Sequence, residues 1–213
     1  MKASFRVSVA FLLYFALWGC ASHEIRALNP DAIDTYRNQT KQAGVTVAAD
    51  SFNTKQKVEM AFTMDLNEQG FVPILLVMEN QTADNFHLLK DDIELVDSRG
   101  NIQKPVPANI MVEKFEHNKI AYALLGFGIF SYMSAEEANR KMFNDWSSKE
   151  LPAEKVLIPS RKSHGVVYFN LGTGLTTLSG STLQIPLLNM RTGERSLAKI
   201  KMGLLPSEWV IFA

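Results

Sequence analysis

Few residues of this 213-residue chain have a type and spacing that could support catalysis. Ser163-His164 places a nucleophile beside a base, but the pair lacks the flanking glycines of a nucleophile elbow and a placed acid, so we interpret it as chance adjacency. Asp91-Asp92 could offer oxygens to calcium, yet no spaced ligands accompany it, and the four histidines show no metal-ligand spacing. The sequence therefore predicts no catalytic residue, no cofactor and no metal site.

Cys20, the only cysteine of the chain, follows directly after an apolar run. Lys2 and Arg6 give a basic start, residues 7–18 are almost entirely apolar, and the small Gly19 stands immediately before the cysteine. These are the three zones of a secretory signal. The run is about a dozen residues long, whereas a bilayer core needs about 20 helical residues. We therefore expect export of the protein rather than a permanent membrane helix.

The residues Leu17-Trp18-Gly19-Cys20 resemble the lipobox of bacterial lipoproteins, although Trp18 is bulkier than the usual residue there. The resemblance implies cleavage between Gly19 and Cys20 and attachment of diacylglycerol to the Cys20 thiol. It also implies an outer-membrane protein facing the periplasm, because the aspartate that tends to retain such proteins at the inner membrane is absent after Cys20. The inner membrane or the cell surface are the alternatives. An ordinary signal peptide, with Cys20 incidental or in an intermolecular disulfide, is the competing interpretation.

The mature chain is expected to form one domain. We predict a signal peptide over 1–19, a lipidated tether over 20–42, a β domain over 43–206 and a C-terminal tail over 207–213. Removal of the signal leaves 20 basic and 22 acidic residues, which gives no nucleic-acid footprint. The expected partners are the membrane, through the lipid anchor, and an envelope protein.

The clearest strand signal is the alternation of apolar residues from Val58 through Met60, Phe62 and Met64 to Leu66. A second, more continuously apolar strand is predicted over 71–79, with Pro73 indicating an edge or a bulge near its start. Residues 93–106 predict a hairpin around a turn at 98–101. Further strands are predicted over the ranges 165–171, 182–190 and 196–204.

A helical insertion over about 109–149 interrupts this β pattern. Ser134 and Glu137 form a capping box, and Met142 and Trp146 continue an apolar stripe at helical spacing. We therefore predict a helix over 135–149 that packs against the sheet, preceded by a weaker helix over 109–117.

The almost wholly apolar residues 120–133 lie between these two helices. They can form part of the core, contact a partner protein, or dip into the bilayer beside the lipid anchor; the core is the preferred interpretation. The candidate residues for partner or membrane contact are Leu124, Leu125, Phe127, Ile129 and Phe130.

Strands with local turns favour a mainly β antiparallel sandwich. The stretch from Val72 to Asn101 resembles immunoglobulin-like domains of bacterial envelope lipoproteins, which implies an immunoglobulin-like sandwich and a binding, adaptor or assembly module rather than an enzyme. The alternative is a lipid-anchored hydrolase of envelope polymers, with a site assembled from residues remote in sequence. A deep cleft with converging acids would favour that alternative.

Replacing the cysteine tests the anchor. Cys20→Ser is expected to block lipid attachment and to stall or release the precursor, because the thiol is the proposed acceptor. Metabolic labelling with a palmitate analogue measures this directly. A mutant that still incorporated the label would end the lipoprotein interpretation.

Overall fold

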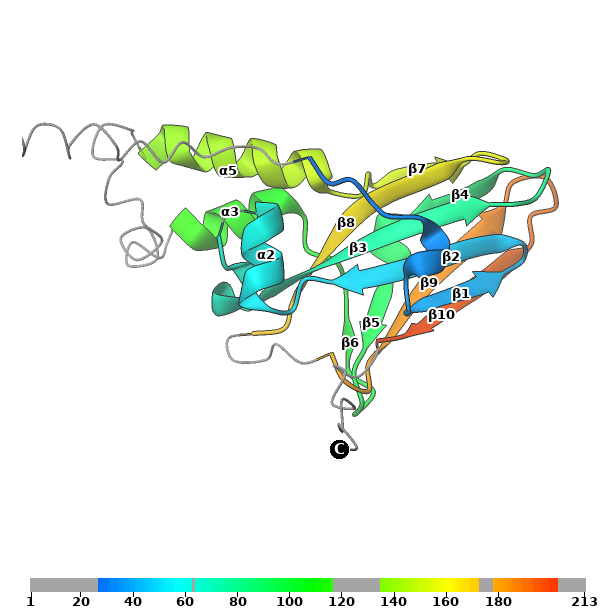
Figure 1. Ribbon diagram of the computed structural model, residues 1–213, viewed down its shortest axis with the longest axis horizontal. Helices are drawn as coiled ribbons and strands as arrows, with labels where there is room; N and C mark the ends of the chain where they lie inside the picture. The colour runs from blue at the N-terminus through cyan, green and yellow to red at the C-terminus, as the bar shows by residue number, and fades with distance from the viewer. Residues whose placement is uncertain (1–26, 63, 117–134, 173–177, 203–213) are drawn as a thin grey trace, which may run out of the picture.

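The structure is a computed structural model that describes residues 27–62, 64–116, 135–172 and 178–202. Two antiparallel sheets face each other and confirm the predicted mainly β sandwich (Figure 1). Sheet A has the order β1 (Gln39–Gln42), β2 (Val45–Ser51), β3 (Phe71–Asn80) and β8 (Lys162–Asn170). Sheet B has the order β6 (Ile102–Gln103), β5 (Glu94–Val96), β9 (Thr182–Asn189), β4 (Phe86–Leu89) and β7 (Glu154–Leu157), and β10 (Arg195–Lys201) pairs with β9.

The three helices of the described residues gather at one end of the molecule (Figure 1). They are α2 (Lys55–Phe62), α3 (Ala108–Glu116) and α5 (Ala135–Lys149), and short 3-10 turns form η1 (Ile33–Thr35), η2 (Leu66–Gln69) and η3 (Lys90–Asp92). Helices α3 and α5 confirm the helical insertion. Met142 and Trp146 are buried in a core cluster shared with sheet A, as the apolar stripe predicted. The capping box stays a prediction, because Ser134 and the Glu137 side chain lie outside the described residues.

The strand predicted from the alternation at 58–66 is wrong, because residues 55–62 form helix α2. Val58, Ala61 and Phe62 are buried at the spacing of a helix, whereas Met60 is 63% exposed. Residues 58 and 62 are four apart, so their apolar side chains fit both the period of two of a strand and the i, i+4 spacing of a helix. The outer face of sheet A needs an apolar cover, and burial against it decides for the helix.

The folded domain also begins earlier than the predicted boundary at residue 43. Instead of a tether, residues 27–42 contain the 3-10 turn η1 and strand β1, and Ile33 is buried in the core. Strand β1 pairs with β2 through a two-residue turn at Ala43 and Gly44, both with positive φ as a type I′ hairpin requires. The tether predicted over 20–42 is therefore wrong from residue 27 onward, and its residues 20–26 lie outside the described part of the chain.

Strand β3 separates two hydrophobic cores. Val72, Ile74, Leu76 and Met78 point between the sheets. Phe71, Leu75 and Val77 point to the opposite face and pack with the helices. The strand pairs with β2 and β8, so the edge or bulge predicted from Pro73 is wrong. Phe52 N donates to the Pro73 carbonyl oxygen (2.9 Å), and the Phe52 carbonyl oxygen, which lacks a donor at Pro73, accepts from Asn67 Nδ2 (3.1 Å) instead.

Buried and half-buried polar groups connect the sheets at the end remote from the helices. The Asn80 side chain, fully buried at the end of β3, donates to the carbonyl oxygens of Leu157 in β7 (2.9 Å) and Asp84 (2.7 Å). The Arg191 guanidinium binds the Asp84 carboxylate, with Nη2 2.8 Å from Oδ2, and Asn189 donates to the same oxygen. Arg191 first and Asn189 second lower the pKa of Asp84 to about 2. Asp84 is therefore ionised wherever the protein is folded under ordinary conditions.

The assignment of helix α2 can be tested by a matched pair of substitutions. Phe62→Ala is expected to destabilise the protein by about 3–5 kcal/mol, because it removes a fully buried aromatic side chain. Met60→Ala, two residues earlier on the exposed side of the same helix, should change stability by no more than about 0.5 kcal/mol. Chemical denaturation of both variants measures the difference. A strand at 58–62 would place residues 60 and 62 on one face and give similar losses.

Candidate functional site

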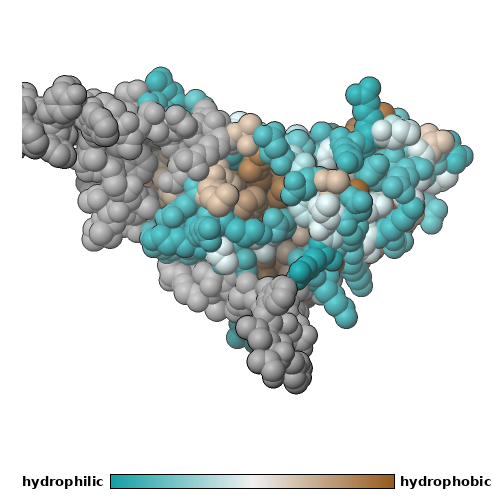
Figure 2. All heavy atoms as spheres, viewed as in Figure 1, coloured by the Kyte–Doolittle hydropathy of each residue, from teal (hydrophilic) through white to brown (hydrophobic). Residues whose placement is uncertain are grey.

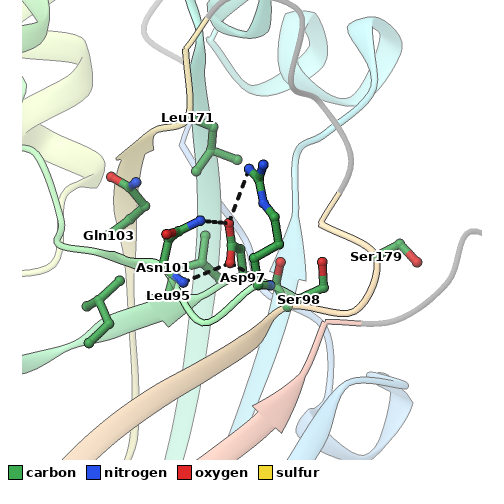
Figure 3. A pocket seen from close by; sticks show the side chains of 10 residues that line it. Leu95, Asp97, Ser98, Asn101, Gln103, Leu171 and Ser179 are labelled. Carbon is green, nitrogen blue, oxygen red and sulfur yellow. Dashed lines mark hydrogen bonds and ion pairs between the residues drawn. The ribbon is translucent and has the colours of Figure 1, made fainter.

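A cavity of about 700 Å³ opens between the β5–β6 hairpin and the segments that follow β8 and precede β9. Figure 3 shows its lining side chains. Three residues give it apolar surface: Leu95, Ile102 and Leu171. The polar lining is larger and consists of Asp97, Ser98, Arg99, Asn101, Gln103, Ser179 and Ser181. This cavity is the candidate functional site because it gathers hydrogen-bonding groups from segments about 80 residues apart in the sequence.

Asp97 organises the hairpin wall of the cavity. Its Oδ1 accepts hydrogen bonds from the backbone N–H groups of Arg99 (2.8 Å) and Asn101 (2.9 Å), and its Oδ2 accepts one from Asn101 Nδ2 (2.7 Å). The Arg99 guanidinium lies 3.6 Å from Oδ2. The Asn101 amide side chain, followed by the backbone donors and Arg99, lowers the pKa of Asp97. The carboxylate is thus ionised and engaged by its own turn.

Glycines allow both walls to take their shape. Gly100 has φ +85° and completes the hairpin turn, with its N–H donating to the Asp97 carbonyl (3.0 Å). Gly180 has φ +76°, and a Cβ there would lie 3.2 Å from Ser98 Cβ. The loop before β9 therefore passes close to the hairpin. A side chain at residue 180 would be strained by its backbone conformation and would crowd Ser98.

The chemistry of the cavity suits binding by hydrogen bonds. Hydroxyl and amide groups can donate to and accept from a polar ligand, and Arg99, whose side chain is 78% exposed, can meet an acceptor or a negative charge. Leu95 supplies a buried apolar floor. The cavity's one carboxylate is a poor general base, because a lowered pKa reduces its affinity for a proton.

The weak catalytic candidates of the sequence do not form a site in the structure. Ser163 and His164 are consecutive residues of β8, so their side chains point to opposite faces of sheet A. Asp91 and Asp92 are exposed in η3. His87 lies 3.7 Å from Glu154 across β4 and β7. Among the described residues, no three of His, Cys, Asp or Glu come together in a way that could hold a metal ion.

Several predicted site residues lie outside the described part of the chain. These are the cleavage and lipidation residues Gly19 and Cys20 and the contact candidates Leu124, Leu125, Phe127, Ile129 and Phe130. Their roles stay predictions. No helix in the described part of the chain combines the length and the apolar character needed to cross a bilayer.

Two ion pairs near the C-terminal end of α5 were not predicted from the sequence. Lys90 Nζ lies 2.5 Å from Glu150 Oε1, while Glu150 Oε2 accepts a hydrogen bond from Ala108 N (3.2 Å). This pair therefore joins η3, the residue that follows α5 and the first residue of α3. Lys149 pairs with Asp145 one turn earlier, and both are almost completely buried. The spacing of four between Asp145 and Lys149 was a local signal for the second pair. No local signal marks Lys90 and Glu150, which are 60 residues apart.

Comparison with known proteins gives little guidance. No family model matches the sequence, and no curated protein matches it. The crystal structure of the yjhA protein from Bacillus subtilis is similar with a TM-score of 0.38 and 13% sequence identity. That similarity covers 76% of this chain and 95% of the yjhA chain. A similarity this distant assigns no function.

The hydrogen bonds to the Asp97 carboxylate predict how its pKa responds to substitution. Asn101→Ala should raise the pKa of Asp97 towards its usual value, because it removes the largest cause of the lowering. Gln103→Ala, which changes another lining residue, should leave that pKa unchanged. Carboxyl NMR titration measures both.

Because the folded pKa is lowered, the stability that the carboxylate contributes is present above its unfolded pKa and is lost as the pH falls through the folded value. The stability gap between the wild type and Asn101→Ala should shrink over that acidic range, and a gap independent of pH would contradict the role given to Asp97.

Proposed function

We propose that this chain is a lipid-anchored envelope protein, held at the outer membrane through Cys20, whose β-sandwich faces the periplasm. There it acts as a non-catalytic binding, adaptor or assembly module. The lipobox-like Leu17-Trp18-Gly19-Cys20 supports the location. The polar cavity at the β5–β6 hairpin supports binding, and the engagement of Asp97 by its own turn is the observation that carries this part of the proposal.

The hydrogen bonds of the Asp97 carboxylate favour binding over catalysis. Hydrolysis of an envelope polymer would need a carboxyl group able to exchange a proton, and commonly a pair of them. Asp97 instead uses both oxygens to hold Arg99 and Asn101 in place. A rigid hairpin that presents Ser98, Arg99 and Gln103 is well suited to recognition, because its donors and acceptors are already positioned before a ligand arrives.

The ligand expected for this cavity is polar, with hydroxyl or amide groups and an acceptor or negative charge for Arg99. Saccharide and peptide parts of envelope polymers, and loops of envelope proteins, have this chemistry. Contact by residues 120–133 with a partner or with the bilayer stays a separate prediction, since the cavity does not depend on it.

Site-specific photo-crosslinking in cells tests the cavity as a binding site. A photoreactive amino acid at Gln103, in the full-length protein, should give a discrete adduct. The same amino acid at Lys199, exposed on the outer face of β10, should not. Arg99→Ala should weaken the Gln103 adduct several-fold. Adducts of equal yield at the two positions would contradict a binding site at the hairpin.

The hydrolase alternative has its own measurement. The purified protein, incubated with isolated envelope polymers, is expected to release no soluble fragments. Release of fragments that Asp97→Asn abolishes would replace the binding proposal with catalysis.

A further inference from the structure

The chain enters the described domain on the face of sheet A that the helices cover. Ala27 and Leu28 line two cavities, one on each side of them. Lys57 and Met60 of α2 share a cavity of about 340 Å³ with them. The C-terminal end of α5 shares one of about 480 Å³, which Lys155 of β7 and His164 of β8 also line. Leu28 packs against the same core cluster as the helices. In Figure 1 this blue segment begins beside the end of α5.

The connection from the proposed lipid to this entry point is short. Only seven residues separate the Cα atom of Cys20 from that of Ala27, counting Ala27 itself. A fully extended chain spans at most about 3.3–3.6 Å per residue, so this tether reaches about 25 Å. Whatever path the tether takes, Ala27 must stay within that distance of the lipidated cysteine.

The length of the tether restricts which face can lie at the membrane. Seen from Ala27, the outer face of sheet B lies on the far side of the sandwich. The two sheets pack about 10 Å apart, and side chains add several ångströms on each side. To place that face flat on the bilayer, the tether would have to run from Ala27 around the edge of the sandwich at β7 and β8, which uses part of its length. The helix-covered face needs no such detour.

The helix-covered face also exposes apolar side chains. Each of the three described helices has one large apolar residue exposed: Met60 on α2 (63%), Ile110 on α3 (45%) and Phe143 on α5 (42%). Val156 and Leu197 are exposed on the outer face of sheet B, so the position of the tether, rather than apolar exposure alone, chooses between the two faces. Figure 2 shows further apolar side chains in the hollow between α2 and the N-terminal segment. Such side chains are suited to the boundary between headgroups and acyl chains, where apolar area stabilises association.

We propose that the face formed by α2, α3, α5 and the segment at Ala27 and Leu28 lies against the lipid surface, and that the β5–β6 hairpin and its cavity point away from it. Figure 1 places that hairpin at the edge of the molecule opposite α5. This inference rests on the proposed function, because it requires the lipid on Cys20. It adds a second partner, the bilayer surface itself, and a fixed orientation of the cavity above it.

The chain offers a clean experiment, because Cys20 is its only cysteine and a lipidated Cys20 has no free thiol. A single new cysteine in the lipidated protein can therefore carry a fluorophore at one chosen place. Phe143→Cys and Met60→Cys report on the helix-covered face. Val156→Cys and Leu197→Cys report on the outer face of sheet B, and Val156 (40%) matches Phe143 (42%) in exposure.

The labelled proteins are placed in vesicles of phosphatidylethanolamine and phosphatidylglycerol that contain a lipid with a nitroxide on its headgroup. Quenching by the nitroxide should be several-fold stronger at residues 60 and 143 than at residues 156 and 197. Equal quenching at the four positions, or stronger quenching at 156 and 197, would overturn the orientation. Mass spectrometry of the same samples shows whether Cys20 is lipidated, so that loss of the anchor, which would defeat the proposed function, is distinguished from a wrong orientation.

Lengthening the tether provides the matched control. A flexible Gly/Ser segment inserted between Ser22 and His23 leaves the lipobox residues and the described domain unchanged. The quenching difference between residues 143 and 156 should then fall, since the longer tether permits other orientations. An undiminished difference would show that tether length does not orient the domain, and would overturn that argument.

Discussion

Burial of β3 on both faces is the constraint on which the rest of the architecture depends. Eight consecutive residues from Phe71 to Met78 are buried, so both faces of this strand require an apolar cover. Sheet B covers one face, and α2, α3 and α5 cover the other. The helical insertion is therefore part of the cover that this face of β3 requires. Without it, Phe71, Leu75 and Val77 would face water, and sheet A would expose a broad apolar surface.

The helix layer is fixed to the sandwich by a close crossing and by paired charges. Gly165 in β8 lies so near Leu151 that a Cβ would come within 2.7 Å of the Leu151 Cα atom, so the chain leaving α5 passes directly over a glycine. Next to this crossing, Glu150 binds Lys90 of η3, which follows β4, and the backbone N–H of Ala108 in the first turn of α3. Burying such a pair is costly unless its remaining hydrogen bonds are satisfied, and the Ala108 N–H satisfies one of them. The pair fixes where the helices sit rather than adding much stability.

Sequence patterns correctly predicted the elements whose local conformational preference agrees with their packing in the fold. The hairpin around residues 97–101 follows from its turn residues, and α5 follows from Met142 and Trp146 at helical spacing. Helix α2 was missed because Val58 and Phe62 fit two periods, and only the uncovered face of sheet A chooses between them. Strand β1 was missed because its four polar residues carry no alternation, and it forms by extending β2. The cavity could not be predicted, since it exists only once Ser179 and Ser181 meet the hairpin.

Because the cavity is open, the binding that we propose for it can be weak. Arg99 is largely exposed, and few of the lining groups are removed from water, so each contact contributes little affinity. Under the lipid anchor that we propose, however, the domain would meet ligands of the same surface at an effective concentration in the millimolar range, which depends on linker length more than on contact strength. Modest intrinsic affinity then gives high occupancy, together with fast exchange. Such a domain can sample many sites on an extended polymer or assembly without becoming fixed at one of them.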